Sequence, residues 1–518
     1  MMVKTRIAPS PTWWLHLGTA RVALYNWLFA KQNNGQFVIR IEDTDRERSE
    51  QQYEEDILEG LRWLGLNPDN DVGQHNPVSP LDKWWQELQN YEDVEPKEFE
   101  SKRRQMERLP LYWKFAYQLL EQGKAYFAWE TSQELEAMRD EAKKAKKPFV
   151  YKKHQYSPEQ LQEFKKQWRK PVLRFQIPDK EIIYEDLIKW EIRFDGKLIS
   201  DIVILKSDGI PTFLFSNVID DWFMGISHVI RGEDHVPNMP KQIPIYEALW
   251  WDVPKYGHLP LLLNKDKTKM SKRSQNMGLV LIKDFKKEGF LPQALINYFA
   301  LLGWHPSWDK EFFSIQELLE EFSLDRVQSS NAIYDYERAL WMNGEYIRML
   351  SDEDFVKALQ TYLLEYWDNE RKKFIKEFDK SYWLKFAPFV KVRLQTLSQF
   401  AQYSKYFFKP QFPDEDILLN PKMKVSKQLL IDILPQIIEL LQSIDSKDWE
   451  LDTLKQKLLE FVKQKWLKNG QVLWPIRAIL TGVKASPWAF EVLYVLGRQE
   501  SLKRLQDFYN LYLQDDKS

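Results

Sequence analysis

The chain lacks cysteine altogether. This absence excludes disulfide bonds, a thiolate nucleophile and a zinc site built on cysteine ligands. Apolar runs are also short, and none approaches the roughly 18 residues that a membrane-spanning helix needs. The first twelve residues, MMVKTRIAPSPT, contain neither the apolar core of a signal peptide nor an Arg- and Ser-rich transit pattern. We therefore expect a cytoplasmic protein that makes no contact with a membrane.

Glycine is scarce and tryptophan is abundant. The chain has 18 glycines in 518 residues, whereas a typical frequency near 7% would give about 36. It also has 22 tryptophans, a high number for this length. Glycine permits positive φ angles and close approach of a ligand to the backbone. Its shortage predicts that some turns of this protein have lost that freedom.

Charge of neither sign predominates, because 74 lysines and arginines face 76 aspartates and glutamates, for a formal net charge of −2. This balance neither favours nor excludes a nucleic-acid partner, so any such contact must come from local basic patches. Basic stretches lie at 143–147, 152–153 and 165–170. They fit two interpretations, a solvated helical face or a surface for nucleic-acid phosphates.

The first part of the chain alternates between strand and helix patterns, and the total length predicts roughly three domains. Residues 3–8 have the pattern of a short buried strand. Residues 19–33 carry apolar side chains at helical spacing and end at Asn-Asn-Gly, and 36–45 form a second strand that ends in acids. Such a strand–helix–strand unit predicts a parallel sheet with ligands at the carboxyl ends of its strands.

The later segments predict a change from mixed to helical structure. A helix is expected at 53–66, an irregular stretch at 67–108 and a further helix at 109–126. Strand patterns follow in PVLRFQIP, EIRFDGK and DIVILKSDG, and the segments 209–223 and 228–235 have a buried, strand-like character. From about residue 326 the pattern is almost wholly helical to the end.

The turn APSPTWWLHLGT, between the first strand and the first helix, is a candidate anion site. Free backbone N–H groups and the positive end of the helix dipole meet there. His16 and Gly18 lie at the start of the helix, and Gly18 lets a ligand approach the backbone. Taken alone, a histidine at this place is more often a helix cap or a packed residue.

Two further motifs carry charge. NKDKTKMSKRSQ, residues 264–275, places Lys269, Lys272 and Arg273 close enough to converge on a polyphosphate, although a solvated basic loop would look the same. Glu42 ends the second strand in VIRIEDTDRERS, where it could bind the ammonium group of a ligand or simply begin an acidic helix.

In their order along the chain, APSPT with HLGTA, VIRIEDTDRERS, HVIRGEDH and KMSKR resemble the class I glutamyl-tRNA synthetases. The signature motifs of that class correspond to His16-Leu17-Gly18-Thr19 and to Lys269-Met270-Ser271-Lys272-Arg273. The resemblance continues in YDYERALWMNGEYI at 334–347, and in GQVLWPIRAILTG and SPWAFEVL at 470–493, as in the bacterial type.

The resemblance implies an α/β Rossmann-type catalytic domain with an inserted α+β connective domain, followed by an all-α anticodon-binding half. The expected boundaries are 1–111 for the first half of the catalytic domain, 112–205 for the insertion that grips the tRNA acceptor end, 206–325 for the second half with the KMSKR loop, and 326–518 for the helical half. The basic stretches of the insertion then favour contact with tRNA.

The activity that the resemblance implies is ATP-dependent ligation of L-glutamate to tRNA(Glu) through glutamyl-adenylate, with Mg²⁺ accompanying ATP. No nucleophilic side chain is needed, because orientation and charge stabilisation supply the rate. Some relatives hold zinc in the insertion on cysteines, which this chain lacks, so no structural metal is expected. A monomer is expected from the family. Whether tRNA(Gln) is also charged depends on residues that the sequence does not place.

The resemblance assigns roles residue by residue. The catalytic residues would be His16, Lys269 and Lys272. The residues expected to bind ATP are His16, Gly18, Thr19, Glu233, Asp234, His235, Met270, Ser271, Lys272 and Arg273. The residues expected to bind glutamate are Arg6, Ala8, Ser10, Glu42, Phe213, Asn217 and Arg231, with Glu42 on the ammonium and Arg231 on a carboxylate, which its planar fork suits.

The chain departs from the family pattern at glycine positions. Trp13 stands in place of the glycine of the usual PSPTG turn, where its bulk could fill the space over the phosphates and positive φ is unfavourable. Trp190, Trp250 and Trp488 also stand where relatives have small residues, and Phe213 replaces a tyrosine. Two hypotheses follow: an active synthetase, or a catalytically impaired scaffold that keeps tRNA binding but has a blocked ATP turn. The composition also fits an altered or designed sequence.

Overall fold

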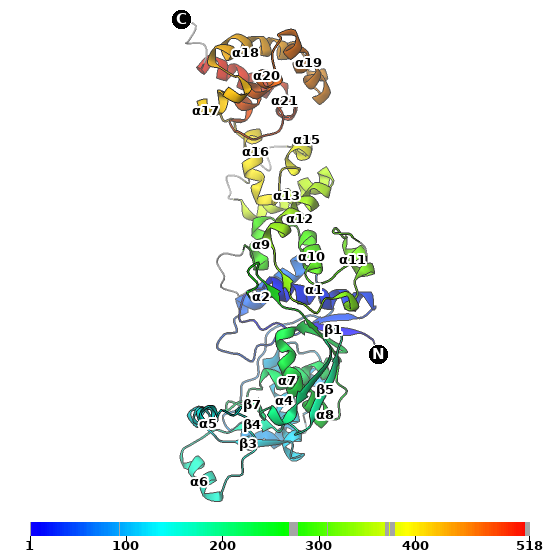
Figure 1. Ribbon diagram of the computed structural model, residues 1–518, viewed down its shortest axis with the longest axis vertical. Helices are drawn as coiled ribbons and strands as arrows, with labels where there is room; N and C mark the ends of the chain where they lie inside the picture. The colour runs from blue at the N-terminus through cyan, green and yellow to red at the C-terminus, as the bar shows by residue number, and fades with distance from the viewer. Residues whose placement is uncertain are drawn as a thin grey trace. The chain divides into compact units, whose positions relative to one another are not determined.

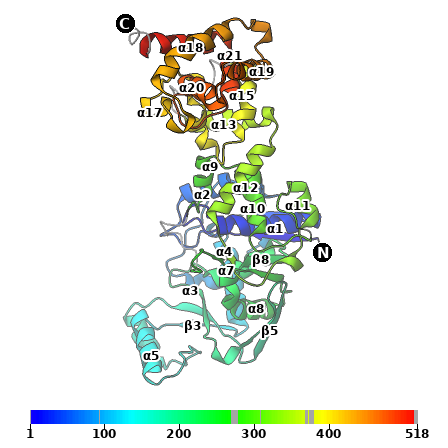
Figure 2. The same cartoon turned by 45° about the horizontal axis from the view of Figure 1, so that its top comes forward.

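The computed structural model describes residues 2–92, 94–268, 278–307, 309–367, 372 and 379–512. The chain divides into two compact units. Unit 1 comprises Met1–Asp284 and Leu295–Tyr336, and unit 2 comprises Phe285–Ala294 and Glu337–Ser518. Unit 1 contains all of the labelled strands, whereas unit 2 is helical (Figures 1 and 2).

Unit 1 is a mixed α/β structure. Its elements are β1 (Lys4–Ile7), α1 (Leu17–Gln32), β2 (Gln36–Ile39), α2 (Gln51–Trp63), α3 (Trp84–Glu87), α4 (Leu109–Glu121), β3 (Ala125–Ala128), α5 (Ser132–Lys144), α6 (Pro158–Lys166), β4 (Val172–Phe175), β5 (Glu181–Asp186), β6 (Trp190–Asp195), β7 (Ile202–Leu205), α7 (Phe213–Phe223), β8 (His228–Gly232), α8 (Met239–Ala248), β9 (Lys255–Leu259), β10 (Leu262–Leu263), α11 (Ile315–Glu321) and β11 (Ala332–Ile333). Two further helices, α9 (Ile282–Glu288) and α10 (Pro292–Leu301), have residues in both units.

The predicted strand–helix–strand unit at the start of the chain is confirmed. β1 pairs in parallel with β2, and α1 connects them. On its other side β1 lies next to β8, where the N–H of Ser227 donates to the carbonyl of Lys4 at 3.0 Å. β8 pairs in parallel with β9. The carboxyl ends of these strands therefore lie at one edge, where the sequence predicts the ligand site.

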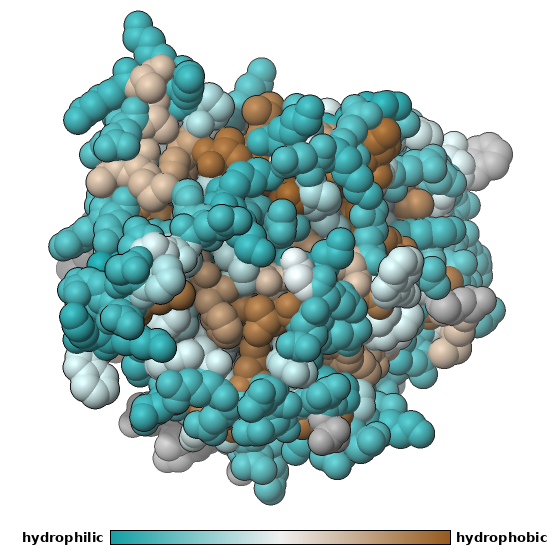
Figure 3. Space-filling view, turned by 90° about the horizontal axis from the view of Figure 1, so that it is seen from below, coloured by the Kyte–Doolittle hydropathy of each residue, from teal (hydrophilic) through white to brown (hydrophobic). Residues whose placement is uncertain are grey.

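The inserted segment contributes to two sheets. Strands β3, β4 and β7 form an antiparallel sheet of their own. The β5–β6 hairpin instead extends the sheet of β8 and β9, because β5 pairs in parallel with β9 through Asp186 and Tyr256. The end of β5 thereby reaches the carboxyl edge of the central strands. Lysines of the predicted basic stretches 143–147 and 165–170 are exposed, and the face seen in Figure 3 is largely hydrophilic.

One secondary-structure prediction is wrong. The segment 209–223, expected to be strand-like, contains helix α7. The helix buries seven consecutive residues, Phe215 to Asp221, so all of its faces are covered near the middle. The apolar residues of this segment do recur at helical spacing, and the polar residues between them are buried as well; the apolar residues are Leu214, Phe215, Val218, Ile219 and Trp222.

Unit 2 confirms the predicted helical half. Its helices are α12 (Tyr336–Met349), α13 (Asp352–Tyr366), α15 (Lys380–Lys391), α16 (Phe400–Phe408), α17 (Glu415–Leu418), α18 (Lys427–Gln442), α19 (Leu451–Gln464), α20 (Asn469–Thr481) and α21 (Ala489–Tyr512). They bury one continuous apolar core that includes Trp383, Phe386 and Phe400. Burial of apolar surface on this scale is the main force that holds such helices together.

Candidate active site

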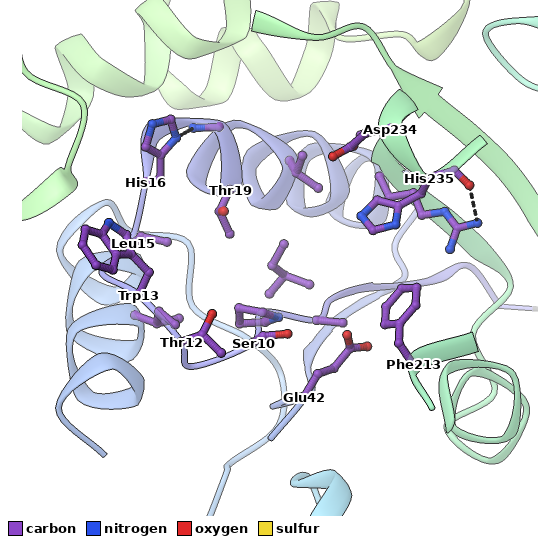
Figure 4. Close-up of a pocket in the computed structure, with 18 of the residues that line it drawn as sticks. Ser10, Thr12, Trp13, Leu15, His16, Thr19, Glu42, Phe213, Asp234 and His235 are labelled. Atoms are coloured by element: carbon purple, nitrogen blue, oxygen red, sulfur yellow. Dashed lines mark hydrogen bonds between the residues drawn. The ribbon is translucent and has the colours of Figure 1, made fainter. Parts of the chain in front are cut away.

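The turn after β1 and the start of α1 form one wall of a pocket of about 710 Å³ (Figure 4). The turn is fixed at both ends. The N–H of Leu15 donates to the carboxylate of Asp56 at 2.7 Å, and the N–H of Leu17 donates to the carbonyl of Val280 at 2.9 Å. The first turn of the helix presents backbone N–H groups and the positive end of its dipole to the pocket, which favours an anion.

His16 is the N-cap of α1. Its Nδ1 accepts a hydrogen bond from the N–H of Gly18 at 3.0 Å. Because Nδ1 accepts, the neutral ring carries its proton on Nε2. The side chain thus holds the helix start with one nitrogen and has a donor on the other, and His16, Gly18 and Thr19 all line the pocket. The capping and anion-binding interpretations of the motif are compatible.

Trp13 and Trp14 form the end of the pocket nearest α2. The Trp13 ring stacks on Tyr53 at 6.2 Å between centroids, and the Trp14 ring meets Tyr53 edge-on at 4.9 Å. Trp14 also lies under the ammonium of Lys283, 3.0 Å from its ring centroid. The backbone at Trp13 has no positive φ. The turn therefore accommodates both indoles in the pocket wall, and the cavity beside them remains open.

The opposite wall is built on buried charges. Arg40 donates to Asp221 at 2.6 Å and to Oε1 of Glu42 at 3.0 Å, and Asn217 donates to the same Oε1 at 2.8 Å. Arg6 lies beside Asp221, with Nε at 3.2 Å from its carboxylate. Burial raises the pKa of Glu42 above its ordinary value, although Arg40 opposes the shift. In Figure 4 the carboxylate of Glu42 is turned into the pocket.

Arg231, at the end of β8, is buried without an acidic partner among the described residues. Its Nε donates to Nε2 of His258 at 3.1 Å and its Nη2 donates to Oε1 of Gln242 at 2.9 Å. Its Nη1 is buried and has no hydrogen-bond partner. Burial lowers the pKa of this guanidinium. A buried cation with an unused N–H is costly unless an anion reaches it, so this corner of the pocket is suited to a carboxylate.

Phe213 and His235 form the end of the pocket farthest from Trp13 (Figure 4). Their rings lie 5.4 Å apart. Burial, together with the charge of Arg231, lowers the pKa of His235 to about 4. The imidazole is therefore neutral at neutral pH, and it can contact a ligand by packing or hydrogen bonding but not as a cation.

Most of the predicted site residues meet in this one pocket. Those that line it are Arg6, Ala8, Ser10, His16, Gly18, Thr19, Glu42, Phe213, Asn217, Arg231, Asp234 and His235. Glu233 does not line it, because its carboxylate contacts Lys189 and accepts the N–H of Leu261 at 3.1 Å.

The predicted residues Lys269, Met270, Ser271, Lys272 and Arg273 lie outside the described residues. The segments on either side of them are described. Leu262, before the motif, lines the pocket, and Val280, after it, is bonded to the start of α1.

Sequence reasoning missed three residues that hold Arg231, namely Asp186, His258 and Gln242. His258 interrupts an otherwise apolar buried strand, and a lone histidine in such a run is a signal that could have found it. Asp186 and Gln242 gave no comparable signal, since they lie in a hairpin and a helix that the sequence does not connect with the pocket.

Two further features concern the described part of the chain, namely metal ligands and membrane-spanning helices. No group of three or more histidine, aspartate or glutamate side chains there is arranged to hold a metal ion. No helix in that part combines the length and the apolar character required to cross a membrane.

Comparison with known proteins gives matches along nearly the whole chain. Residues 2–341 match the family of class I tRNA synthetases (E and Q), catalytic domain, and residues 354–509 match an anticodon binding domain. A glutamate--tRNA ligase of Thermodesulfovibrio yellowstonii is 37% identical over 511 residues, which are 98% of this chain and 99% of that protein. A glutamate--tRNA ligase of a Sulfurihydrogenibium species is 36% identical over 514 residues, covering 99% and 100%.

Solved structures show the same likeness. The crystal structure of a glutamate tRNA ligase from Elizabethkingia meningosepticum, in complex with its amino acid, has a TM-score of 0.82 and 30% identity, covering 99% of this chain and 100% of that one. The glutamate-tRNA synthetase structure from Elizabethkingia anophelis has a TM-score of 0.79 and 30% identity, covering 98% and 99%.

Proposed function

Because this chain belongs to the class I tRNA synthetases of the E and Q type, with an anticodon-binding domain, we propose that it ligates L-glutamate to tRNA(Glu) at the expense of ATP. A carboxylate oxygen of glutamate attacks the α-phosphorus of ATP, which forms glutamyl-adenylate and releases pyrophosphate. A ribose hydroxyl of the terminal adenosine of tRNA then attacks the acyl carbon, which forms the ester and releases AMP.

The observation that carries this proposal is Arg231. Among its described neighbours the guanidinium has only neutral partners, and one buried N–H has none. A substrate carboxylate would supply the missing charge and the missing acceptor together. A neutral ligand would leave the desolvation of the cation uncompensated.

Other residues of the same wall suit the rest of an amino acid. Both described contacts to the Glu42 carboxylate go to Oε1, so Oε2 is the oxygen we assign to the substrate's ammonium group. Arg6, Ala8, Ser10, Phe213 and Asn217 complete the glutamate site in the proposal. The raised pKa of Glu42 means that acid weakens this contact at a higher pH than for an ordinary carboxyl group.

We assign ATP to the end of the pocket at the start of α1. Its phosphates would meet the N–H groups of the helix and the Nε2 donor of His16, while Gly18 and Thr19 let them approach. Asp234 and His235 would contact the nucleoside, and Glu233 would act on it only indirectly through the segment it holds. Lys269, Met270, Ser271, Lys272 and Arg273 complete the proposed ATP site, with Lys269 and Lys272 on the transition-state charge.

Mg²⁺ would neutralise charge on the triphosphate, and it would arrive with ATP. No step is assigned to a structural zinc. The proposal further assigns the acceptor end of tRNA to the insertion at 112–205, within the catalytic domain of 1–111 and 206–325, and the anticodon to helices of 326–518. We expect the enzyme to act as a monomer in the cytoplasm.

The test is glutamylation of tRNA(Glu), with radiolabelled glutamate, ATP and Mg²⁺, by the chain and by its Trp13→Gly variant. We expect the chain to be active and the variant to have a kcat/KM for ATP raised by about 10-fold, equal to about 1.4 kcal/mol. The reason is that Trp13 occupies the wall beside the phosphate end and buries an indole N–H that lacks a hydrogen-bond partner.

Trp14→Gly is the matched control, because Trp14 shares the contact with Tyr53 but holds Lys283 as well. If the chain is silent and Trp13→Gly recovers activity, the impaired-scaffold hypothesis holds, with the defect confined to one turn. If both proteins are folded and silent, the proposed function is wrong. A parallel reaction with tRNA(Gln) shows whether that tRNA is also a substrate.

A further inference from the structure

A buried acid–imidazole pair lies behind the guanidinium of Arg231, and the proposed function does not use it. Nδ1 of His258 is 2.6 Å from Oδ2 of Asp186, and Nε2 of His258 accepts from Nε of Arg231 at 3.1 Å. The side chains of Asp186 and His258 are completely buried. The three residues therefore form a chain of hydrogen bonds that ends at the pocket.

The chain of bonds fixes the tautomer of His258. An arginine N–H can only donate, so Nε2 must present its lone pair and the ring proton must be on Nδ1, directed at Asp186. Burial lowers the pKa of His258, which agrees with a neutral ring. The other carboxylate oxygen of Asp186 accepts the N–H groups of Ile188 and Lys189, each at 2.9 Å. The carboxylate is thus held on both sides.

This arrangement orients Arg231 without neutralising it. A carboxylate placed directly on the guanidinium would pair with the cation and remove the pocket's need for an anion. The imidazole instead accepts one N–H while it stays neutral, and Gln242 and Met239, at 2.9 Å and 3.1 Å from Nη2, are neutral as well. The imidazole ring of His258 separates the negative charge of Asp186 from the guanidinium. The free N–H of Nη1 is left for the ligand.

We propose that Asp186 and His258 are positioning residues that act through Arg231 and determine the preference for a side-chain carboxylate over the corresponding amide. The proposal rests on the proposed function, since Arg231 must meet glutamate. If the tautomer of His258 is reversed, its N–H meets the N–H of Arg231, and the guanidinium has to turn or move away.

Asp186→Asn tests the pair directly. The amide can donate to Nδ1 and so favours the reversed tautomer. We expect kcat/KM for glutamate to fall roughly 10–100-fold, as for other outer partners of a binding group, mainly through KM for glutamate. KM for ATP is expected to change less than about 3-fold. The ratio of kcat/KM for glutamate to kcat/KM for glutamine should fall by about the same factor as kcat/KM for glutamate itself.

Asp201→Asn is the matched control, because Asp201 is an equally buried carboxylate in unit 1 that bonds Tyr126 and Ile177 and does not line the pocket. It should leave KM for glutamate and the discrimination unchanged. If Asp186→Asn has the same KM for glutamate and the same discrimination between glutamate and glutamine as Asp201→Asn, the proposal is overturned. An inactive wild-type chain that still binds glutamate would instead count against the proposed function.

A second pair of variants covers the case in which Asp186→Asn does not fold. His258→Gln keeps an acceptor for Arg231, whereas His258→Leu does not. We expect KM for glutamate to rise several-fold more in His258→Leu than in His258→Gln. Equal values in the two variants would contradict a positioning role.

A different observation carries a second inference. Four tryptophans have backbone φ angles in the left-handed region, namely Trp168 (53°), Trp190 (64°), Trp250 (59°) and Trp466 (54°). Their side chains are 73% to 95% exposed, so no burial compensates the unfavourable backbone. Four other tryptophans, the largest fully buried ones, have ordinary φ angles; these are Trp84, Trp113, Trp304 and Trp383.

Three of the four tryptophans with left-handed backbone end helices as glycine does. After α8, the N–H of Trp250 donates to the carbonyl of Glu247 and that of Trp251 to Tyr246. The same two bonds occur at Gly123, whose N–H donates to Leu120 while the next residue donates to Leu119. Trp168 and Trp466 repeat them after α6 and α19. This helix ending favours glycine, because its last position has positive φ.

We infer that positions 168, 190, 250 and 466 carry glycine in the chain that the cell makes, with their codon read as glycine. The shortage of glycine and the surplus of tryptophan agree with this. The inference predicts one codon at these four positions and another at Trp84, Trp113, Trp304 and Trp383. The inference extends to Trp13 if the codon of Trp13 is the one found at positions 168, 190, 250 and 466.

The test is the mass of peptides from the protein isolated from its source cells, read beside the gene. Glycine masses at the four positions and tryptophan masses at the buried ones support the inference. Tryptophan masses at all eight positions overturn it. Independently, single Trp→Gly variants at 168, 190, 250 and 466 should each raise the midpoint of thermal unfolding, and a lowered midpoint at all four would contradict the need for glycine.

Discussion

Replacing Arg231 by glutamine is expected to lower kcat/KM for glutamate by about 1,000-fold. Loss of one partner from a desolvated charge pair costs about 3–5 kcal/mol, and about 4 kcal/mol corresponds to a factor of about 1,000. Arg231 is a guanidinium of the pocket that has no acidic neighbour among the described residues, whereas Arg6 is already paired with Asp221. Arg21, which also lines the pocket without a described acidic partner, is held by the carbonyl of Pro260 at 2.8 Å.

The measurement is steady-state glutamylation with each substrate varied in turn. The variant should differ from the wild type mainly in KM and kcat/KM for glutamate. Its KM for ATP should stay within about 3-fold of the wild-type value, because the phosphates are assigned to the other end of the pocket. Arg174→Gln is the control. Arg174 is also buried, donates to the carbonyl of Asp201 at 2.7 Å and lies over Tyr151. A loss of 10-fold or less in Arg231→Gln, or an equal loss in the control, would refute the assignment.

His16 provides the second large effect, and two variants separate its two roles. His16→Ala and His16→Asn should both lower the rate of glutamyl-adenylate formation by about 100–1,000-fold, the usual cost of removing one donor from a developing negative charge. Asparagine keeps an oxygen that can accept the N–H of Gly18, so only His16→Ala should also lose about 1 kcal/mol of stability through the N-cap.

The rate is followed by tRNA-dependent exchange between pyrophosphate and ATP, and the stability by thermal unfolding. If His16→Asn keeps nearly full activity, the histidine is a helix cap and nothing more. If both variants lose stability and activity in parallel, the loss of activity reflects a disordered helix start. Either result would remove His16 from the phosphate site.

Local patterns were enough to find the strand, turn and helix that carry the first wall. Alternation, the Asn-Asn-Gly stop and the placement of His16 and Gly18 each involve residues within a few positions of one another. Such signals depend on backbone preferences that act over one or two turns of chain. The prediction for α7 was wrong because the apolar character of the stretch was given more weight than the helical spacing of its apolar residues, which the sequence does contain.

The tryptophans also show what the sequence predicted and what only the structure revealed. Motif comparison pointed to four tryptophans that stand where relatives have glycine or another small residue, namely Trp13, Trp190, Trp250 and Trp488. The structure distinguishes them, since Trp190 and Trp250 take left-handed backbone whereas Trp13 and Trp488 do not. It adds Trp168 and Trp466, which no motif singled out. A φ angle depends on how a helix or hairpin ends, and the sequence did not place those ends with that accuracy.

The sequence by itself determined the family and named twelve of the residues that line the pocket, because these are encoded in short ordered motifs. Only the tertiary structure decided which charges in that pocket are satisfied. Asp186 and His258 are 72 positions apart and meet because β5 of the insertion pairs with β9. Whether Arg231 is left with an unused N–H depends on that meeting, and hydrogen bonds between buried groups are set by packing across the sheet.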